Sequence, residues 1–173
     1  MTARRPSPAT PQLVPPQPSP SAPVLDIVQA DDRWARVADA HSCVKAAVAA
    51  AHAPQAAGSV CVALENDATV RQLNKRWRGK DQPTNVLSFA GPDPAILAPG
   101  VLRHLGDIVL AYETVMAQAQ AENIPPAHHL MHLVVHGMLH LHGMDHHTEA
   151  AAEAMEARER SILAQLGVAD PYA

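Results

Sequence analysis

The stretch HHLMHLVVHGMLHLHGMDHH, residues 128–147, holds eight of the eleven histidines in the chain and decides its fold. Its other positions are almost all apolar, so a helix formed here carries apolar side chains around most of its circumference. A helix of that kind is buried among other elements of the protein. We therefore predict a central, buried helix over residues 127–142.

Two histidines of this predicted helix have the spacing of a metal site. His136 and His140 are four residues apart, which places them one turn apart on the same helix face. Gly143 can adopt the left-handed conformation that ends a helix, so that the chain brings His146 back towards the same ion. Three histidine nitrogens with a fourth position left for water is the pattern of catalytic zinc sites. We predict one zinc ion per chain on His136, His140 and His146, and nickel or cobalt would also suit these ligands.

A rival triplet of His132, His136 and His140 does not fit one ion. Its outer members would lie about 12 Å apart along a helix axis. Zinc–nitrogen bonds are about 2 Å long, so both ends could not reach the same metal. We expect the remaining histidines of the stretch to be core or surface residues.

The spacing of the three ligands matches the metzincin protease pattern H-E-x-x-H-x-x-G-x-x-H, with one difference. Gly137 stands where those enzymes carry the glutamate that acts as general base. The metal ligands of a zinc hydrolase are thus predicted without the peptidase base. A metallopeptidase-like zinc hydrolase stays an alternative, and so does a non-catalytic protein with structural zinc.

Composition limits the kind of partner. The formal net charge is −4, so the chain as a whole is not an electrostatic nucleic-acid binder. Five of the thirteen basic residues nevertheless lie within residues 71–80. No apolar run has the length of a membrane span, and the first residues lack the apolar region of a secretory signal. We predict a cytoplasmic protein with no membrane partner.

The first 23 residues differ in composition from the rest. They contain eight of the sixteen prolines together with Ser, Thr and Gln, and they cannot bury enough apolar surface to fold. We predict a disordered Pro-rich extension over residues 1–23 and a single domain over residues 24–173.

Hydrophobic periodicity and capping residues place the elements of that domain. Strands are predicted over residues 24–28, 59–64, 84–89 and 105–110. Helices are predicted over residues 33–52, 68–78, 112–122, 127–142 and 149–166. Asn66 or Asp67 would cap the second helix, and Thr148 would cap the last. This order predicts an α+β fold, in which a small mixed sheet of about four strands is covered by about five helices, with the histidine helix at its centre.

Four segments resemble one known family. They are HGMLHLHGMDH at 136–146, LNKRWRGKDQPTNVLSF at 73–89, LGDIVL at 105–110 and ILAQLGVADPY at 162–172. Together they resemble the bacterial YbeY family of single-strand endoribonucleases and ribosomal RNA maturation factors, over about residues 24–172. His142 and Ala90 depart from the usual residues of that family, and neither is a proposed ligand.

The resemblance implies a zinc-dependent endoribonuclease that acts in the cytoplasm on single-stranded RNA. It implies a role in ribosomal RNA processing, including 3′-end maturation of the small-subunit RNA, and in ribosome quality control. The implied partners are the small ribosomal subunit and its assembly factors, and the non-catalytic alternative becomes a ribosome-assembly factor. The metal-binding histidines of the family map to His136, His140 and His146, and an important arginine maps to Arg78.

The chemistry of RNA cleavage suits these residues. An arginine can hold two phosphate oxygens in a fork, and its charge does not titrate. We expect Arg78 to act in this way beside the metal, with the other basic residues of 71–80 along the RNA backbone. The general base stays open between Asp107, Asp145 and none. Asp81 and Asn85 are expected to hold the loop.

Overall fold

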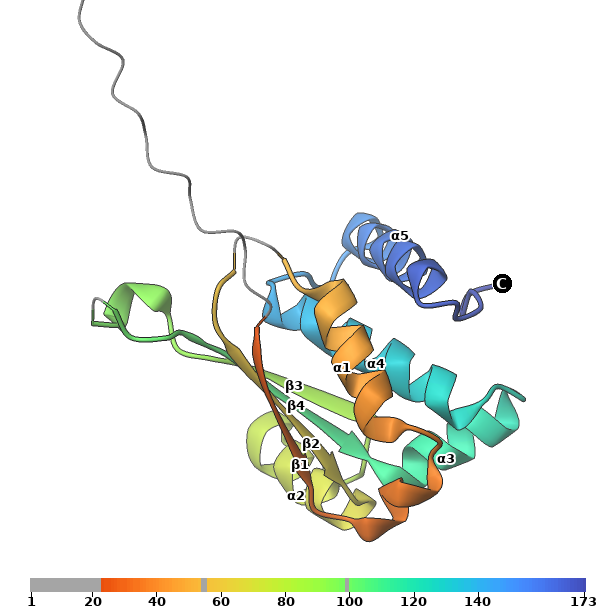
Figure 1. Cartoon of the computed structure of the whole chain (residues 1–173). Helices are drawn as coiled ribbons and strands as arrows, with labels where there is room; N and C mark the ends of the chain where they lie inside the picture. Colours follow the sequence, from red (N-terminus) through yellow and green to blue (C-terminus); the bar gives the residue numbers. More distant parts are fainter. Residues whose placement is uncertain (1–22, 54–55, 99) are drawn as a thin grey trace, which may run out of the picture.

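The computed structural model describes residues 23–53, 56–98 and 100–173, which form a four-stranded sheet with helices on both faces (Figure 1). The extension predicted over residues 1–23 lies, except for Pro23, outside the described residues. In the described part, no helix is both long enough and apolar enough to cross a bilayer.

The sheet is mixed, with the strand order β1-β2-β4-β3. Strands β1, β2 and β4 run parallel, and the edge strand β3 pairs antiparallel with β4. The strands are β1 (Val24–Gln29), β2 (Ser59–Glu65), β3 (Val86–Ala90) and β4 (His104–Ala111). The α-helices are α1 (Ala40–Ala51), α2 (Asp67–Arg78), α3 (Tyr112–Ala121), α4 (Pro126–Leu141) and α5 (Glu149–Gln165). The predicted α+β class and mixed sheet are confirmed.

The helices divide the hydrophobic core into two unequal parts. Helices α1 and α4 cover one face of the sheet, and α5 packs on α4 further out (Figure 1). Most of the buried apolar residues belong to this side. On the opposite face, α2 covers a small cluster formed by Val70, Leu87, Val109 and Ala111. Within the described part of the chain, much of that second face has little cover.

Helix α4 is the centre of the larger core, as predicted. It contacts α1, α3, α5, β3 and β4, and Leu130, Val134 and Met138 are fully buried. Gly137 lets it approach β4 closely, because a Cβ atom at this position would lie 2.9 Å from Cγ2 of Ile108. The absence of a side chain at Gly137 is therefore a packing requirement of the fold.

The helix predicted over residues 33–52 is wrong as one continuous element. The structure has a short 3₁₀ helix (Asp32–Arg36), an extended residue at Val37 and then α1. At 3.6 residues per turn, an unbroken helix would turn Trp34 roughly 100° away from the apolar face of α1. The break lets Trp34 become fully buried while its Nε1–H donates to the carbonyl oxygen of Glu65 at 2.9 Å.

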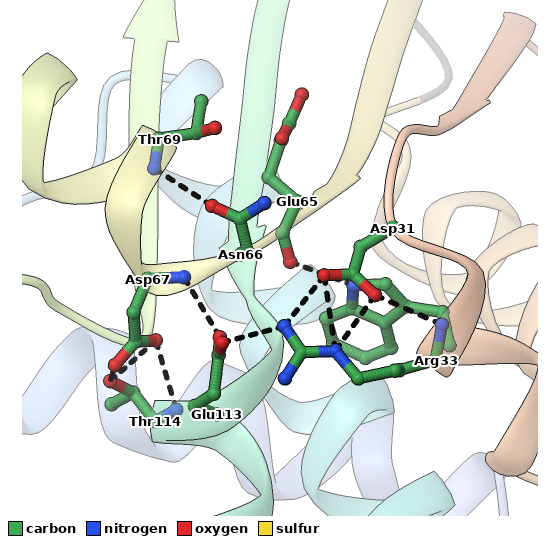
Figure 2. Close-up of polar contacts among 9 residues, drawn as sticks. Asp31, Arg33, Glu65, Asn66, Asp67, Thr69, Glu113 and Thr114 are labelled. Atoms are coloured by element: carbon green, nitrogen blue, oxygen red, sulfur yellow. Dashed lines mark hydrogen bonds and ion pairs between the residues drawn. The ribbon is translucent and has the colours of Figure 1, made fainter.

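A polar network joins the starts of three elements beneath this break (Figure 2). Arg33 donates to Asp31 at 2.7 Å and to Glu113 at 2.5 Å, and Glu113 accepts from the backbone N–H of Asp67. The hydrogen bonds from Arg33 lower the pKa of Asp31 to about 2. Asn66 caps α2 by accepting from the N–H of Thr69 at 2.9 Å, one of the two predicted caps. The network fixes α2 against α3 at the end of the sheet.

Candidate metal centre

The end of α4 turns the chain back towards the helix. Gly143 has φ +85°, its N–H donates to the carbonyl of His140, and the N–H of Met144 donates to the carbonyl of Leu139. This pair of bonds is a Schellman motif, which needs a left-handed residue at the position of Gly143. The turn returns His146 to the face of α4 that carries His140, as the sequence predicts.

The three predicted ligands meet at this turn. His136, His140 and His146 each offer one ring nitrogen, and these nitrogens all lie within 4.8 Å of one another. The Nε2 atoms of His136 and His140 are 3.0 Å apart. Two nitrogens bound to a tetrahedral zinc ion are separated by about 3.3 Å, from Zn–N bonds of about 2.0–2.1 Å. The spacing of the donor atoms therefore fits a single small metal ion.

The outer nitrogen of His136 is held by Glu159, a residue of α5. Its Nδ1–H donates to Oε1 of Glu159 at 2.7 Å. The other oxygen of this buried carboxylate contacts His132 Nε2 at 3.2 Å and accepts a short hydrogen bond from the hydroxyl of Tyr172. Burial alone would raise the pKa of the Glu159 carboxyl, but these three hydrogen bonds outweigh it and hold the pKa at about 2. Glu159 is thus an anion that keeps the proton of His136 on Nδ1.

A backbone carbonyl does the same for His140. Its Nδ1–H donates to the carbonyl oxygen of Met144 at 2.9 Å. Burial and the neighbouring His136 lower the pKa of His140, and the charge of Arg78 adds to this effect. The Nε2 atoms of His136 and His140 therefore remain on the side where the rings meet, 3.0 Å apart. Both nitrogens could bind one cation placed between them, so the donor set suits a metal ion.

The three histidines form one wall of a pocket of about 550 Å³. Arg78 and Lys80, from the end of α2 and the loop after it, lie on the same pocket. The other lining residues are Thr84, Asn85, Val86, Ser88, Asp145 and His147. The structure thus brings together all four predicted site residues, His136, His140, His146 and Arg78. The pocket combines candidate metal ligands with positive charge.

The loop that follows Arg78 is held from both ends, as expected for Asp81 and Asn85. Asp81 accepts from Arg71 at 2.7 Å and from Lys75 at 2.8 Å. Asn85 donates to Gln118 at 3.0 Å. Arg71 and Lys75 are therefore paired with Asp81 at the surface of the protein. Of the basic cluster, Arg78 and Lys80 line the pocket itself.

The two candidate general bases, Asp145 and Asp107, lie in different parts of the structure. Asp145 lines the pocket, and its carboxylate accepts from the N–H of His147 at 3.1 Å. Asp107 lies on β4, contacts His104 at 3.0 Å and lines a different hollow on the other face of the sheet. Asp145 is therefore the one carboxylate among the described residues that line the pocket.

Sequence reasoning missed Glu159 and Tyr172. Glu159 lies on the stripe of α5 formed by Met155, Ile162 and Leu163, all of which are buried. A carboxylate on the apolar stripe of a helix is an unusual placement, and it was the signal available in the sequence. The partner of this carboxylate could not be read, because it depends on how α5 packs against α4.

Fold and site together define a class: an α+β protein with a three-histidine candidate metal centre in a pocket lined by basic residues. The family model described as Endoribonuclease YbeY matches residues 28–167. The chain belongs to this endoribonuclease YbeY family.

Named relatives agree over most of the chain. A Rhodopseudomonas palustris protein named Endoribonuclease YbeY is 49% identical over 156 residues, which cover 87% of this chain and 91% of the relative. A Chelativorans protein of the same name is 55% identical over 130 residues, with 75% and 78% covered. A solution structure from Thermotoga maritima aligns with a TM-score of 0.45 at 22% identity, over 86% of this chain and 98% of the other.

Proposed function

We propose that this protein is a metal-dependent endoribonuclease that cleaves single-stranded RNA, with one zinc ion per chain on His136, His140 and His146. One observation carries the proposal: the converging ring nitrogens of these histidines share a pocket with Arg78 and Lys80. When bound, such an ion supplies Lewis acidity towards a phosphoryl oxygen or water. The membership of the endoribonuclease YbeY family supports RNA as the substrate.

We assign the other roles in RNA cleavage to four residues in and beside the pocket. The guanidinium of Arg78 would hold the scissile phosphate by its oxygens and stabilise the charge that develops on them during cleavage. Lys80 would bind an adjacent phosphate as a point charge. Asp145, the carboxylate among the described pocket residues, would accept a proton from water or from a ribose 2′-hydroxyl. Glu159, which contacts Nδ1 of His136, would hold the ring in the tautomer that offers Nε2 to a bound ion.

A peptidase is disfavoured by the packing of α4. The base of a metzincin would occupy position 137, where a Cβ atom already meets Ile108. A glutamate at this position has no room unless the buried side chain of Ile108 shifts. A structural zinc is disfavoured because the three histidines line a pocket of about 550 Å³ that can take a substrate.

We further propose that the biological substrate is ribosomal RNA. The resemblance to ribosomal RNA maturation factors supports 3′-end processing of the small-subunit RNA in the cytoplasm, with a role in ribosome quality control. Contacts with the small ribosomal subunit and its assembly factors belong to the same proposal. Cells that carry an inactive variant should accumulate small-subunit RNA with an unprocessed 3′ end, which mapping of RNA ends would reveal.

The direct test is cleavage of single-stranded RNA by the purified full chain, run beside a peptide substrate. The samples are the protein as isolated, the metal-stripped protein, the zinc-restored protein and the His140→Ala variant. A matched control is His147→Ala, since His147 lines the pocket but is not one of the three clustered ligands. We expect RNA cleavage to follow zinc, to vanish in His140→Ala and to persist in His147→Ala. Cleavage that survives metal removal and His140→Ala, or metal-dependent cleavage of the peptide alone, would overturn the proposal.

A further inference from the structure

A second hollow lies on the sheet face opposite α4. It has a volume of about 620 Å³ and lies between α2 and strands β2, β3 and β4. Two aromatic side chains stand in its lining, Trp77 from α2 and Phe89 from β3, with ring centroids 6.1 Å apart and ring planes at 60°. We call this hollow the Trp77–Phe89 groove. The remaining lining residues are Cys61, Ala63, Leu73, Ser88, Ala90, Asp107 and Val109.

Trp77 does not behave as the core residue that its position on α2 predicts. Val70, on the same apolar stripe, is fully buried, whereas Trp77 keeps 62% of its surface exposed. The indole ring therefore contributes little to the packing of α2 on the sheet. A large exposed aromatic side chain beside an apolar hollow is typical of a binding surface.

The groove and the metal pocket share one lining residue at the edge of the sheet. Ser88 lines both hollows, and it belongs to the edge strand β3, around which an extended ligand can pass from one sheet face to the other. Arg78 follows Trp77 directly in the chain and lines the metal pocket. The last turn of α2 therefore contributes one side chain to each hollow, Trp77 to the groove and Arg78 to the metal pocket.

The charges around the groove select the kind of ligand. The guanidinium of Arg76 lies over the Trp77 ring, 5.3 Å from its centre. Asp107, inside the groove, would repel a phosphate group. The groove thus suits a flat, uncharged ring whose attached phosphates lie outside it, next to the basic residues. A nucleobase of single-stranded RNA has these properties, and such bases bind proteins by stacking on aromatic side chains.

We propose that the Trp77–Phe89 groove binds a nucleobase of the RNA substrate, from a nucleotide that neighbours the one held at Arg78. The base stacks on the indole ring of Trp77 and meets the tilted ring of Phe89 with its edge. The inference rests on the proposed ribonuclease function for its choice of RNA. It extends that function by giving the enzyme a binding site for unpaired bases. A duplex does not present such bases.

Intrinsic fluorescence tests the stacking directly, because the chain has two tryptophans and Trp34 is fully buried. The probe is a single-stranded oligoadenylate with 2′-O-methyl riboses, which lack the hydroxyl needed for internal attack. It is titrated into the full chain and into the variants Trp77→Ala, Trp77→Phe and Ile96→Ala. Ile96 is a control because it is exposed and apolar but lies outside the groove. Affinities are measured in parallel by the anisotropy of a labelled probe, and RNA cleavage by each variant is recorded.

We expect the probe to quench the emission of the wild-type protein and of Ile96→Ala. Trp77→Ala should lose the quenching and bind about ten-fold more weakly, since stacking on one aromatic side chain contributes roughly 1–3 kcal/mol per base. Trp77→Phe should lose the quenching but keep most of the affinity. Binding of the probe without quenching, or unchanged affinity in Trp77→Ala, would overturn the inference and leave the groove to another partner, such as a protein.

The same measurements separate this inference from the proposed function. Zinc-dependent RNA cleavage that does not depend on Trp77 would refute base binding in the groove and support the proposed ribonuclease function. Quenching and Trp77-dependent binding without any cleavage would support base binding in the groove and refute the ribonuclease function.

Discussion

Nδ1 of His136 lies 2.7 Å from Oε1 of Glu159, a buried carboxylate on a different helix. This contact occupies Nδ1 of His136 and leaves Nε2 directed at the other candidate ligands. A carboxylate behind a histidine fixes the ring and makes it a better metal ligand. The candidate metal centre therefore depends on how α5 packs on α4 as well as on the histidines themselves.

Replacement of Glu159 by Gln should weaken metal binding. The amide is nearly isosteric but uncharged, and outer partners of ligand histidines contribute about 10- to 100-fold in metal affinity. Zinc affinity can be measured by competition with a chromogenic chelator. Glu153→Gln is the matched control, because Glu153 lies on the same helix but is exposed. Equal zinc affinities in the two variants would mean that Glu159 has only a structural role.

Arg78→Ala should lower the turnover number for RNA cleavage by about 10²–10³, the usual cost of removing one donor to a developing oxyanion. Zinc content and thermal stability should stay unchanged, because Arg78 is exposed. Arg78→Lys should restore only part of the rate, since an ammonium group cannot bind two oxygens in a fork. Arg158→Ala, an exposed arginine of α5, controls for the loss of charge. Equal rates for the Arg78 and Arg158 variants would refute the phosphate contact.

Gly137→Ala should destabilise the fold by a net of up to ~2 kcal/mol, from an overpacking cost of about 1–3 kcal/mol less about 1 kcal/mol for the better helix propensity of alanine. The added methyl group would lie 2.9 Å from Cγ2 and 3.0 Å from Cδ1 of Ile108, a buried and β-branched side chain. Ile108→Val removes one of these contacts. The free energy of unfolding of the double variant should therefore fall by less than the sum of the decreases in the two single variants. Urea unfolding of the four proteins gives this comparison, and strict additivity would contradict it.

Gly143→Ala should affect both stability and metal binding. A non-glycine residue in the left-handed region costs about 1–2 kcal/mol, and here the strain falls on the turn that carries His146. Gly79→Ala is the matched control, since Gly79 ends α2 with φ +70° and, like Gly143, has nothing within 4 Å of the added Cβ. Both variants should melt at lower temperature, and Gly143→Ala alone should bind zinc more weakly. The same zinc affinity in both would show that the turn does not set the position of His146.

The network of Asp31 and Arg33 should make stability depend on pH in the acid range. The pKa of Asp31 is lowered from 3.8 to about 2, mainly by hydrogen bonds from Arg33. The ionised carboxylate therefore stabilises the fold above pH 3.8, and this contribution disappears as the pH falls towards 2. Asp31→Asn should melt below the wild type near neutral pH, and the difference should shrink in acid. Asp32→Asn provides the control, and a difference that stayed constant with pH would contradict the assignment.

The sequence was informative wherever a local rule decided the outcome. The spacing of His136 and His140, the glycine turn at Gly143 and the caps Asn66 and Thr148 follow from helix geometry, and the structure shows all of them. These features involve residues within one element or one turn of each other. Propensity and spacing therefore suffice to predict them.

Features that depend on distant elements were not predicted. The break before α1 exists because Trp34 is buried against Glu65 of β2. The exposure of Trp77 follows from how little of the second sheet face α2 covers. The paired state of Arg71 and Lys75 depends on a loop conformation that brings back Asp81. Each of these is set by tertiary packing, which a single sequence does not display.

The position of α4 at the centre of the core has a genetic consequence. The helix that carries His136 and His140 also contacts three other helices and two strands. Random substitutions in α4 should therefore tend to remove the protein from the cell along with its activity. Alleles that abolish function while the protein accumulates normally should map instead to the exposed residues around the pocket, Arg78, Asp145 and His146. A selection for dominant-negative mutants would recover this second group.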